Sequence, residues 1–304
     1  MSKIIVGVDA SAGASDAICL ATRLADITGA EIMLVNVFPY DQHPSRAVNT
    51  AFEQYLRQDS TELLEALRSR LGDATVAVHA VPNTSSAHGL DTIAEREDAD
   101  LIVVGSTHTG RTGRVLPGST AERLLHGAPC PVAVAPKGYG DHDAKAPTSI
   151  GCGFDGSPSS QRALEAAGGL AAATGARLRV ILAFRPGSDI AAKGVPFGGM
   201  AVYNDGLRDQ AHDELDAAVA ELGLPAAEGE LVIGDAERVL ADRSQQLDLL
   251  VVGSRGYGPM HAVIVGSVAG RLMREAACPV IVVPRGAGHT RADSLFVTAA
   301  SVQG

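Results

Sequence analysis

A group of glycines and one serine near the end of the chain has the spacing of a phosphate-binding loop. The apolar strand expected at Leu249–Val252 ends at Gly253, and Gly256 follows. Gly266 and Ser267 then begin a helix, which completes the pattern G-x-x-G-x9-G-S. Glycines lack a Cβ, so backbone amides can approach a ligand, and a serine at a helix start adds its hydroxyl, unpaired N–H groups and the positive end of the dipole. The pattern therefore predicts binding of a phosphate group.

The two halves of the chain repeat each other. KIIVGVDAS near the start matches SIGCGFDGS and aligns Asp9 with Asp155. ADLIVVGS matches LDLLVVGS and aligns Gly105 with Gly253. Internal repeats of this kind indicate duplicated structural units. We expect a first domain at 1–137, a linker at 138–147, a second domain at 148–285 and a tail without assigned function at 286–304.

Each copy alternates short apolar strands with helical patterns. In copy one the first strand is expected at 4–8 and the last at 132–135. Such alternation predicts an α/β fold in which each copy forms a doubly wound, five-stranded parallel sheet. If the strand order is 3-2-1-4-5, the carboxyl ends of strands one and four flank the crevice where such folds bind ligands. The strand-one aspartate and the glycine loop would then meet at one cleft per copy.

Composition excludes several kinds of partner. The formal charge is −10, the pI is near 5.3 and no Lys/Arg cluster could follow a nucleic-acid backbone, so we expect no nucleic acid partner. No apolar run approaches the ~20 residues that span a bilayer. The segment MSKIIVGVDA lacks a leader pattern and the four cysteines have no C-x-x-C spacing, so we expect a cytoplasmic protein with reduced thiols. We predict no metal site.

Copy two resembles the universal stress protein family in three features: the strand-one aspartate, the G-x-x-G-x9-G-S loop and the segment A-x-C-P-V-x-V-V-P. The whole chain is similar to a tandem member. The resemblance implies an adenine-nucleotide-hydrolase-like sheet that binds ATP, with Asp155 facing the ribose or base and Phe184 near the adenine. The resemblance also implies a set of residues that bind the phosphates, which are Gly253, Ser254, Arg255, Gly256, Gly266, Ser267 and Val268. Val252, which precedes them, belongs to the same predicted site.

Copy one departs from this pattern at one position. The resemblance carries over to Asp9, Val37, Gly105, Gly118 and Ser119. His108, however, stands where the family has the second glycine. A Cβ is unfavourable where the backbone needs φ > 0, so this loop is strained or differently shaped. The prediction of nucleotide binding is therefore stronger for copy two, and binding in copy one stays open.

Structural roles explain several of these residues without a ligand. Ser119 and Glu122 fit a capping box, so the serine could serve only its helix. Asp9 and Asp155 could be turn-formers, and Arg255 could be a solvated loop charge. The repetition of the two aspartates, at one predicted cleft per copy, favours the ligand role for them, and for Arg255 we favour a phosphate contact.

Three functions follow from these alternatives. The first is an ATP-binding module for stress response or signalling, with at most slow hydrolysis and with Mg²⁺ held mainly by phosphate and water. The second is an adenylyltransferase or ATP pyrophosphatase. Its strand-one signatures His-x-Gly-His and Ser-Gly-Gly-x-Asp are missing, as are a Walker-type lysine and a poised base, so we do not expect an enzyme.

The third function is a nucleotide-free interaction module. The last strands, VAVAP and VIVVP, would be exposed apolar edges in isolated copies, and such edges tend to pair. We predict that they meet across a pseudo-two-fold axis within the chain. Pairing with another chain, as in a homodimer, is the alternative.

Overall fold

The computed structural model describes residues 2–40, 50–106, 115, 118–141, 145–186, 199–254, 270, 272 and 274–284. The elements of the first repeat are β1 (Lys3–Gly7), α1 (Ala12–Thr28), β2 (Glu31–Phe38), α2 (Thr50–Leu71), β3 (Ala77–Pro82), α3 (Ser86–Arg96), β4 (Leu101–Gly105), α4 (Ser119–Leu124) and β5 (Val132–Ala135). A 3-10 turn, η1 (Tyr139–Asp141), follows.

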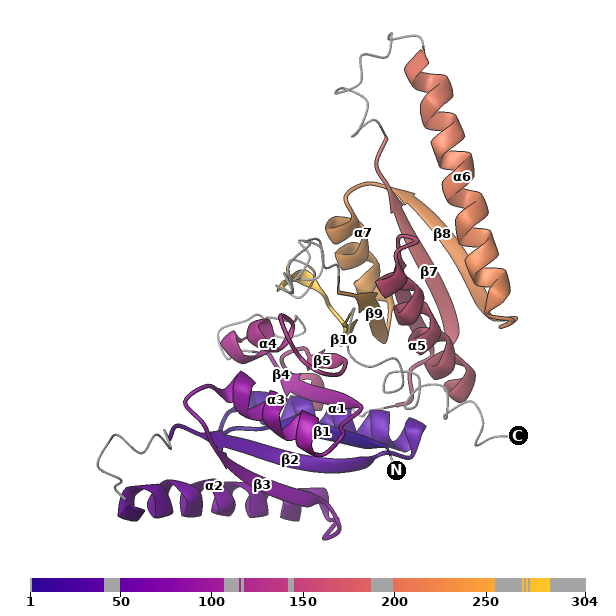
Figure 1. Ribbon diagram of the computed structural model, residues 1–304. Helices are drawn as coiled ribbons and strands as arrows, with labels where there is room; N and C mark the ends of the chain where they lie inside the picture. The colour runs from indigo at the N-terminus through magenta and orange to yellow at the C-terminus, as the bar shows by residue number, and fades with distance from the viewer. Residues whose placement is uncertain are drawn as a thin grey trace.

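The described elements of the second repeat follow the same order through the fourth strand, apart from a 3-10 turn before that strand, and most residues between its last two strands lie outside the described ranges. The elements are β6 (Ser149–Phe154), α5 (Pro158–Thr174), β7 (Arg177–Phe184), α6 (Gly199–Glu221), β8 (Ala227–Ile233), α7 (Ala236–Arg243), the 3-10 turn η2 (Ser244–Gln246), β9 (Leu249–Gly253) and β10 (Val280–Val283). Helices α2 and α6 lie at opposite ends of the molecule (Figure 1).

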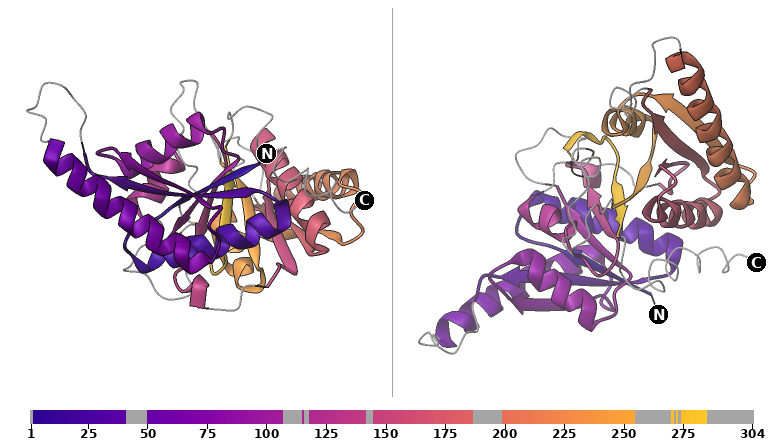
Figure 2. Two further views of the ribbon diagram at one scale, coloured as in Figure 1. Left: turned by 90° about the horizontal axis from the view of Figure 1, so that it is seen from below. Right: turned by 45° about the horizontal axis from the view of Figure 1, so that its top comes forward.

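The strands form one ten-stranded sheet in the order β3-β2-β1-β4-β5-β10-β9-β6-β7-β8. Within each repeat all pairs are parallel, which confirms the predicted α/β class. The two repeats join through the antiparallel pair β5–β10, in which Ala133 lies opposite Ile281. Figure 2 shows β10 in yellow at this junction. The predicted meeting of the last strands is confirmed, and it fuses the two expected sheets into one because each apolar edge completes the other.

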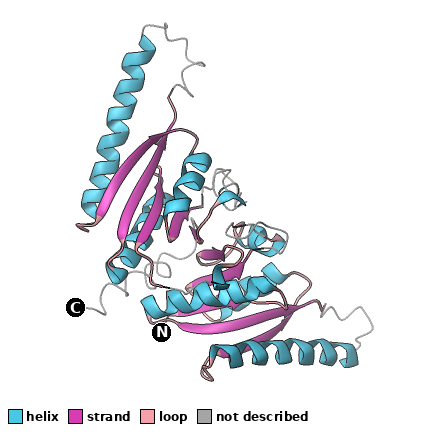
Figure 3. Ribbon diagram, turned by 180° about the vertical axis from the view of Figure 1, so that it is seen from behind, coloured by secondary structure: helices cyan, strands magenta, loops and turns pink. Residues whose placement is uncertain are grey.

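Helices cover both faces of the sheet (Figure 3). Because side chains alternate along a strand, Ile4 and Val6 enter the core cluster beneath α1, while Ile5 enters the cluster beneath α3. Both clusters contain buried residues of both repeats, with Ala133 and Ile281 in the first. The hydrophobic core is therefore continuous across the junction.

Local sequence signals account for the ends of α1 and α5. Gly29 and Gly175 end α1 and α5 in the left-handed conformation, with φ of 70° and 69°. Ser157 begins α5, and its hydroxyl accepts a hydrogen bond from the Ser160 N–H at 3.3 Å. Pro158 occupies the first turn, where its missing N–H costs nothing.

The start of the predicted linker packs against α1. The buried carboxylate of Asp16 accepts hydrogen bonds from the Gly138 N–H at 2.9 Å and from the Gly140 N–H at 2.7 Å. The Arg23 guanidinium lies over the Tyr139 ring, 4.6 Å from its centroid. The first residues of the segment expected to be the linker are therefore held by the first repeat.

Among the helices that the structure describes, none combines the length and the apolar character needed to cross a bilayer.

Candidate functional site

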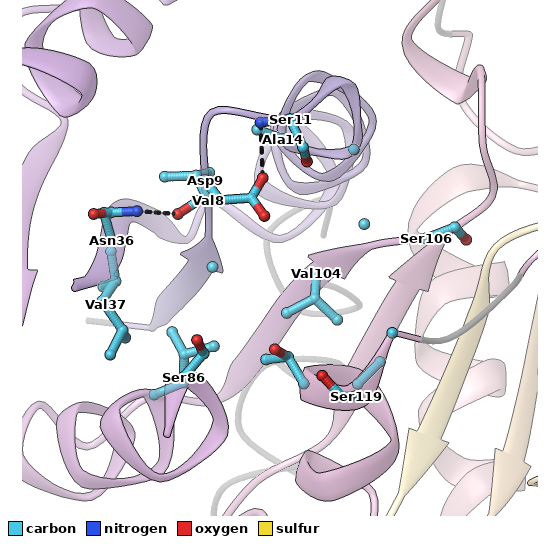
Figure 4. Close-up of a pocket in the computed structure, with 18 residues that line it drawn as sticks. Val8, Asp9, Ser11, Ala14, Asn36, Val37, Ser86, Val104, Ser106 and Ser119 are labelled. Atoms are coloured by element: carbon cyan, nitrogen blue, oxygen red, sulfur yellow. Dashed lines mark hydrogen bonds between the residues drawn. The ribbon is translucent and has the colours of Figure 1, made fainter. Parts of the chain in front are cut away.

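A cavity of about 240 Å³ opens at the carboxyl ends of the first-repeat strands. Its walls are the turn after β1, the end of β2, and the ends of α3, β4 and α4 that face this edge of the sheet (Figure 4). It includes every position predicted for copy one, which are Asp9, Val37, Gly105, Gly118 and Ser119. Residues more than a hundred positions apart in the chain therefore share one cavity, as the strand-end argument predicts.

The aspartate at the end of the first strand also holds its own turn. Asp9 Oδ1 accepts a hydrogen bond from the Ser11 N–H at 2.9 Å, while the residue itself is exposed (Figure 4). In the second repeat Asp155 Oδ1 accepts from the Ser157 N–H at 3.1 Å. Both repeats therefore use the aspartate as a turn-former, and the turn fixes the carboxylate at the cavity.

Two further polar residues, which the sequence interpretation missed, support this wall of the cavity. Asn36, which lines it, donates from Nδ2 to the Val8 carbonyl oxygen at 2.7 Å. The buried Ser60 of α2 donates its hydroxyl to Asn36 Oδ1, also at 2.7 Å. An asparagine inside the apolar run EIMLVNVF was the available signal, because a polar side chain in a buried strand needs a partner.

Close helix packing explains the glycine at the end of the fourth strand. A Cβ on Gly105 would lie 2.1 Å from the backbone oxygen of Gly13, at the start of α1. A Cβ on Gly253 would lie 2.6 Å from the backbone carbonyl of Ser159 at the same place in the second repeat. Both glycines are therefore required by the fold itself, whatever they do for a ligand.

The serines that follow these glycines differ. Ser106 donates its hydroxyl to the Ala135 carbonyl at 2.7 Å. Ser254 is 2% exposed, and its hydroxyl has no hydrogen-bond partner in the part of the chain that the structure describes. Leaving a buried hydroxyl unpaired costs roughly 1–3 kcal/mol. Ser254 Oγ is therefore a candidate donor to a ligand.

The second repeat has a smaller described cavity of about 90 Å³ at the same place. Asp155, Val252 and Gly253 line it, together with the buried Ser159 and Ser160 at the start of α5. The other phosphate positions predicted for copy two lie outside the described residues; these are Arg255, Gly256, Gly266, Ser267 and Val268. His108 of copy one also lies outside them.

The prediction for Phe184 needs a correction of one residue. Gly7 pairs with Val35 and Gly153 pairs with Ile181, so the counterpart of Val37 is Ala183. Ala183 lines the second cavity, whereas Phe184 packs against the core cluster on the other face of the sheet. A slip of one residue in aligning two strands moves a side chain to the opposite face, which is why the sequence alignment failed here.

The two cavities present amides and hydroxyls rather than cations. Neither lysine nor arginine occurs among the described residues that line them. Likewise, no group of three or more metal-ligating side chains occurs within the described ranges. Among the described lining residues, the groups available to bind an anion are therefore backbone N–H groups and hydroxyls.

Known proteins resemble this chain in both sequence and fold. A family model described as the universal stress protein family matches residues 1–136 and 148–284. One universal stress protein of Mycobacterium tuberculosis is 31% identical over 294 residues, covering 92% of this chain and 95% of its own. Another from the same organism is 28% identical over 294 residues, covering 92% of this chain and 99% of its own.

Two solved structures are similar over the whole length. A universal stress protein from Archaeoglobus fulgidus gives a TM-score of 0.64 at 18% identity, covering 93% of this chain and 98% of its own. A putative one from Pseudomonas aeruginosa gives 0.61 at 15% identity, covering 100% and 98%. At these identities the likeness concerns the fold. With the family model matching both halves, the chain belongs to the universal stress protein family as a tandem, two-domain member.

Proposed function

We propose that this universal stress protein binds ATP at the carboxyl ends of its parallel strands and serves as a nucleotide-dependent module in stress response or signalling. One observation carries the proposal: the strand-one aspartate and the residues after strand four, far apart in sequence, line one cavity in the first repeat. Asp9 would face the nucleoside beside Val37, and Gly105, Gly118 and Ser119 would contact the phosphates.

The second repeat is proposed as a second nucleotide site. Asp155 stands where Asp9 does, Val252 and Gly253 line the cavity, and Ser254 offers a buried hydroxyl. Arg255, Gly256, Gly266, Ser267 and Val268 would supply the remaining phosphate contacts. Ala183, rather than Phe184, would lie beside the base. Mg²⁺ would accompany the phosphates and be held mainly by their oxygens and by water.

We propose binding with at most slow hydrolysis. Among the described residues that line the two cavities there is no histidine, lysine or cysteine to act as base or nucleophile. The carboxylates of Asp9 and Asp155 each hold a turn.

The four cysteines are free thiols, three of them buried, which supports a reducing compartment, and we propose the cytoplasm.

The interaction-module alternative has less support. The apolar edges of β5 and β10 pair with each other inside the chain, so these edges are not available to another chain. A homodimer would have to use a different surface.

Equilibrium binding of ATP to the full chain tests the proposal. Asp9→Ala should weaken the first site by about tenfold or more, since a charged hydrogen bond contributes about 1.5–3 kcal/mol. Asp155→Ala and Gly256→Val should weaken the second. Asp73→Ala is the matched control, because Asp73 holds a similar exposed turn through the Thr75 N–H at 2.8 Å, away from both cavities. Native mass spectrometry of co-purifying nucleotide gives the stoichiometry.

The proposal fails if the parent chain does not bind millimolar ATP, or if the two cavity aspartates can be replaced without loss of affinity.

A further inference from the structure

Two contacts join the first repeat to a short segment that precedes β10 in the second repeat. The N–H of Val115 donates to the Ala276 carbonyl at 2.9 Å, and both residues are fully buried. Arg274 Nη2 pairs with Glu122 Oε1 at 3.2 Å. Glu122 belongs to α4, whose first residue, Ser119, lines the first cavity. The short segment 274–277 is therefore attached directly to the element that bounds the first site.

The same segment is attached to the wall of the second cavity. The N–H of Ala277 donates to Ser244 Oγ at 2.9 Å, and this hydroxyl donates to the Ala241 carbonyl of α7 at 2.6 Å. Ser244 is 1% exposed, so its hydrogen bond to Ala241 is buried, while the one from Ala277 is partly buried. Helix α7 supplies Ala236 and Leu240 to the lining of the second cavity.

The first repeat cannot form the corresponding link. Leu90 and Leu240 occupy equivalent positions, since each stands against a strand glycine, Gly7 or Gly153. Four residues further along, α3 has Ala94 where the second repeat has Ser244. Matching Cys130 with Cys278 places Pro129 opposite Ala277, and proline has no N–H to donate. The first repeat therefore lacks both the hydroxyl that accepts and the N–H that donates in this hydrogen bond.

We propose that segment 274–277 and Ser244 form a relay, hereafter the inter-repeat relay, that couples ATP binding at the two cavities. This inference rests on the proposed function. Ligand in the first cavity orders α4, which orders segment 274–277 and, through Ser244, α7. A ligand that then enters the second cavity causes a smaller loss of conformational entropy, so the coupling is positive. By linkage the second ligand strengthens the first by the same factor.

The test measures ATP affinity at the second cavity with the first cavity intact and with it weakened by Asp9→Ala, using isothermal titration calorimetry of the full chain. Asp155→Ala identifies the heat that belongs to the second cavity. In the parent chain we expect binding there to be about fivefold tighter when the first cavity is intact, the lower end of typical couplings.

Two variants break the relay at different atoms. Ser244→Ala removes the hydroxyl and Ala277→Pro removes the donor, and each introduces the residue that the first repeat already carries. Both should abolish the fivefold difference. Leu178→Ile is the matched control, because it also introduces the first-repeat residue, Ile32, but lies in the core away from the relay. Thermal unfolding shows whether each variant is folded. If one of the two variants does not fold, the other variant alone tests the relay.

The outcomes separate the two claims. Equal affinities with and without Asp9→Ala in the parent chain overturn the relay, and so does a difference that survives in a folded Ser244→Ala or Ala277→Pro variant. Absence of ATP binding by the parent chain overturns the proposed function, and the relay with it.

Discussion

Asp9 and Gly105 each have a structural role that does not depend on a ligand. Asp9 holds the turn after β1 through the Ser11 N–H, and Gly105 makes room for the Gly13 carbonyl of α1. Substitutions at the cavity therefore change folding and binding together, unless each one is chosen according to the structural contact that it removes. Aspartate substitutions remove one exposed hydrogen bond and suit binding experiments, whereas substitutions of the strand-end glycines test the packing.

Gly105→Ala should destabilise the protein by at least about 3 kcal/mol, since the new Cβ would collide with backbone rather than with a flexible side chain. Gly127→Ala is the control, because a Cβ there meets nothing within 4 Å, and it should change stability by less than about 0.5 kcal/mol. Urea unfolding measures both. Similar midpoints for the two variants would contradict this account of Gly105.

Asp91 of α3 should make stability depend on pH. Burial raises the pKa of its carboxyl from 3.8 to about 6, with the charge of His88 opposing the rise and that of Glu95 adding to it. Its Oδ1 has no hydrogen-bond partner among the described residues. The folded state therefore holds its proton where the unfolded chain has lost it. The contribution of Asp91 to stability is consequently full below about pH 4 and falls as the pH rises through 6.

Asp91→Asn removes this penalty. At about pH 7 the variant should be more stable than the parent by about 1 kcal/mol, a value already reduced for solvent screening of a partly exposed group. The advantage should shrink as the pH falls and vanish below about pH 4. Thermal unfolding across this range checks it, and a stability difference that does not change with pH would refute it.

At the scale of elements, α1 does more than cover the sheet. Its start packs against Gly105 at the cavity, and its buried Asp16 holds η1 through two backbone N–H groups. Helix α5 has Arg162 at the position of Asp16, and Arg162 donates from Nη2 to the Pro284 carbonyl after β10 at 3.3 Å. In both repeats this helix therefore fixes the chain that leaves the last strand.

Asp16→Asn should release η1, because an amide can accept with only one oxygen where the carboxylate uses two. We expect a loss of about 2 kcal/mol of stability and faster hydrogen exchange at the Gly138 and Gly140 amides. Asp26→Asn, at an exposed position of the same helix, is the control. Unchanged protection of the two amides in Asp16→Asn would show that Asp16 does not hold the turn.

At the scale of the whole molecule, the β5–β10 pair makes the two repeats one folding unit. The continuous sheet and the shared core clusters predict a single cooperative unfolding transition. Ile281→Asp places a charge in the fully buried centre of the junction and should cost about 4 kcal/mol or more.

Ile233→Asp makes the same chemical change on the outer strand β8, where the side chain is 61% exposed, and should have little effect. Urea unfolding followed by circular dichroism compares the three chains. Two separate transitions in the parent, or an Ile281→Asp midpoint like that of Ile233→Asp, would contradict the single-unit account.

The sequence by itself determined the repeat, the α/β class and the meeting of the last strands, while the family resemblance suggested the positions that line the cavity of copy one. These predictions depend on local signals, because apolar strands, helix caps and strand-end glycines are each encoded by a few neighbouring residues. It also suggested Asp9 and Asp155 as residues of one cleft per copy, since the strand order brings strands one and four together.

Only the tertiary structure decided the rest, because it depends on contacts between distant segments. Strand register assigned Ala183 rather than Phe184 to the second cavity. Helix packing revealed why Gly105 is a glycine, and long-range hydrogen bonds identified Asn36 with Ser60 and Ser244 with Ala277. No local pattern encodes such pairs, since each residue is ordinary until its partner is placed beside it by the fold.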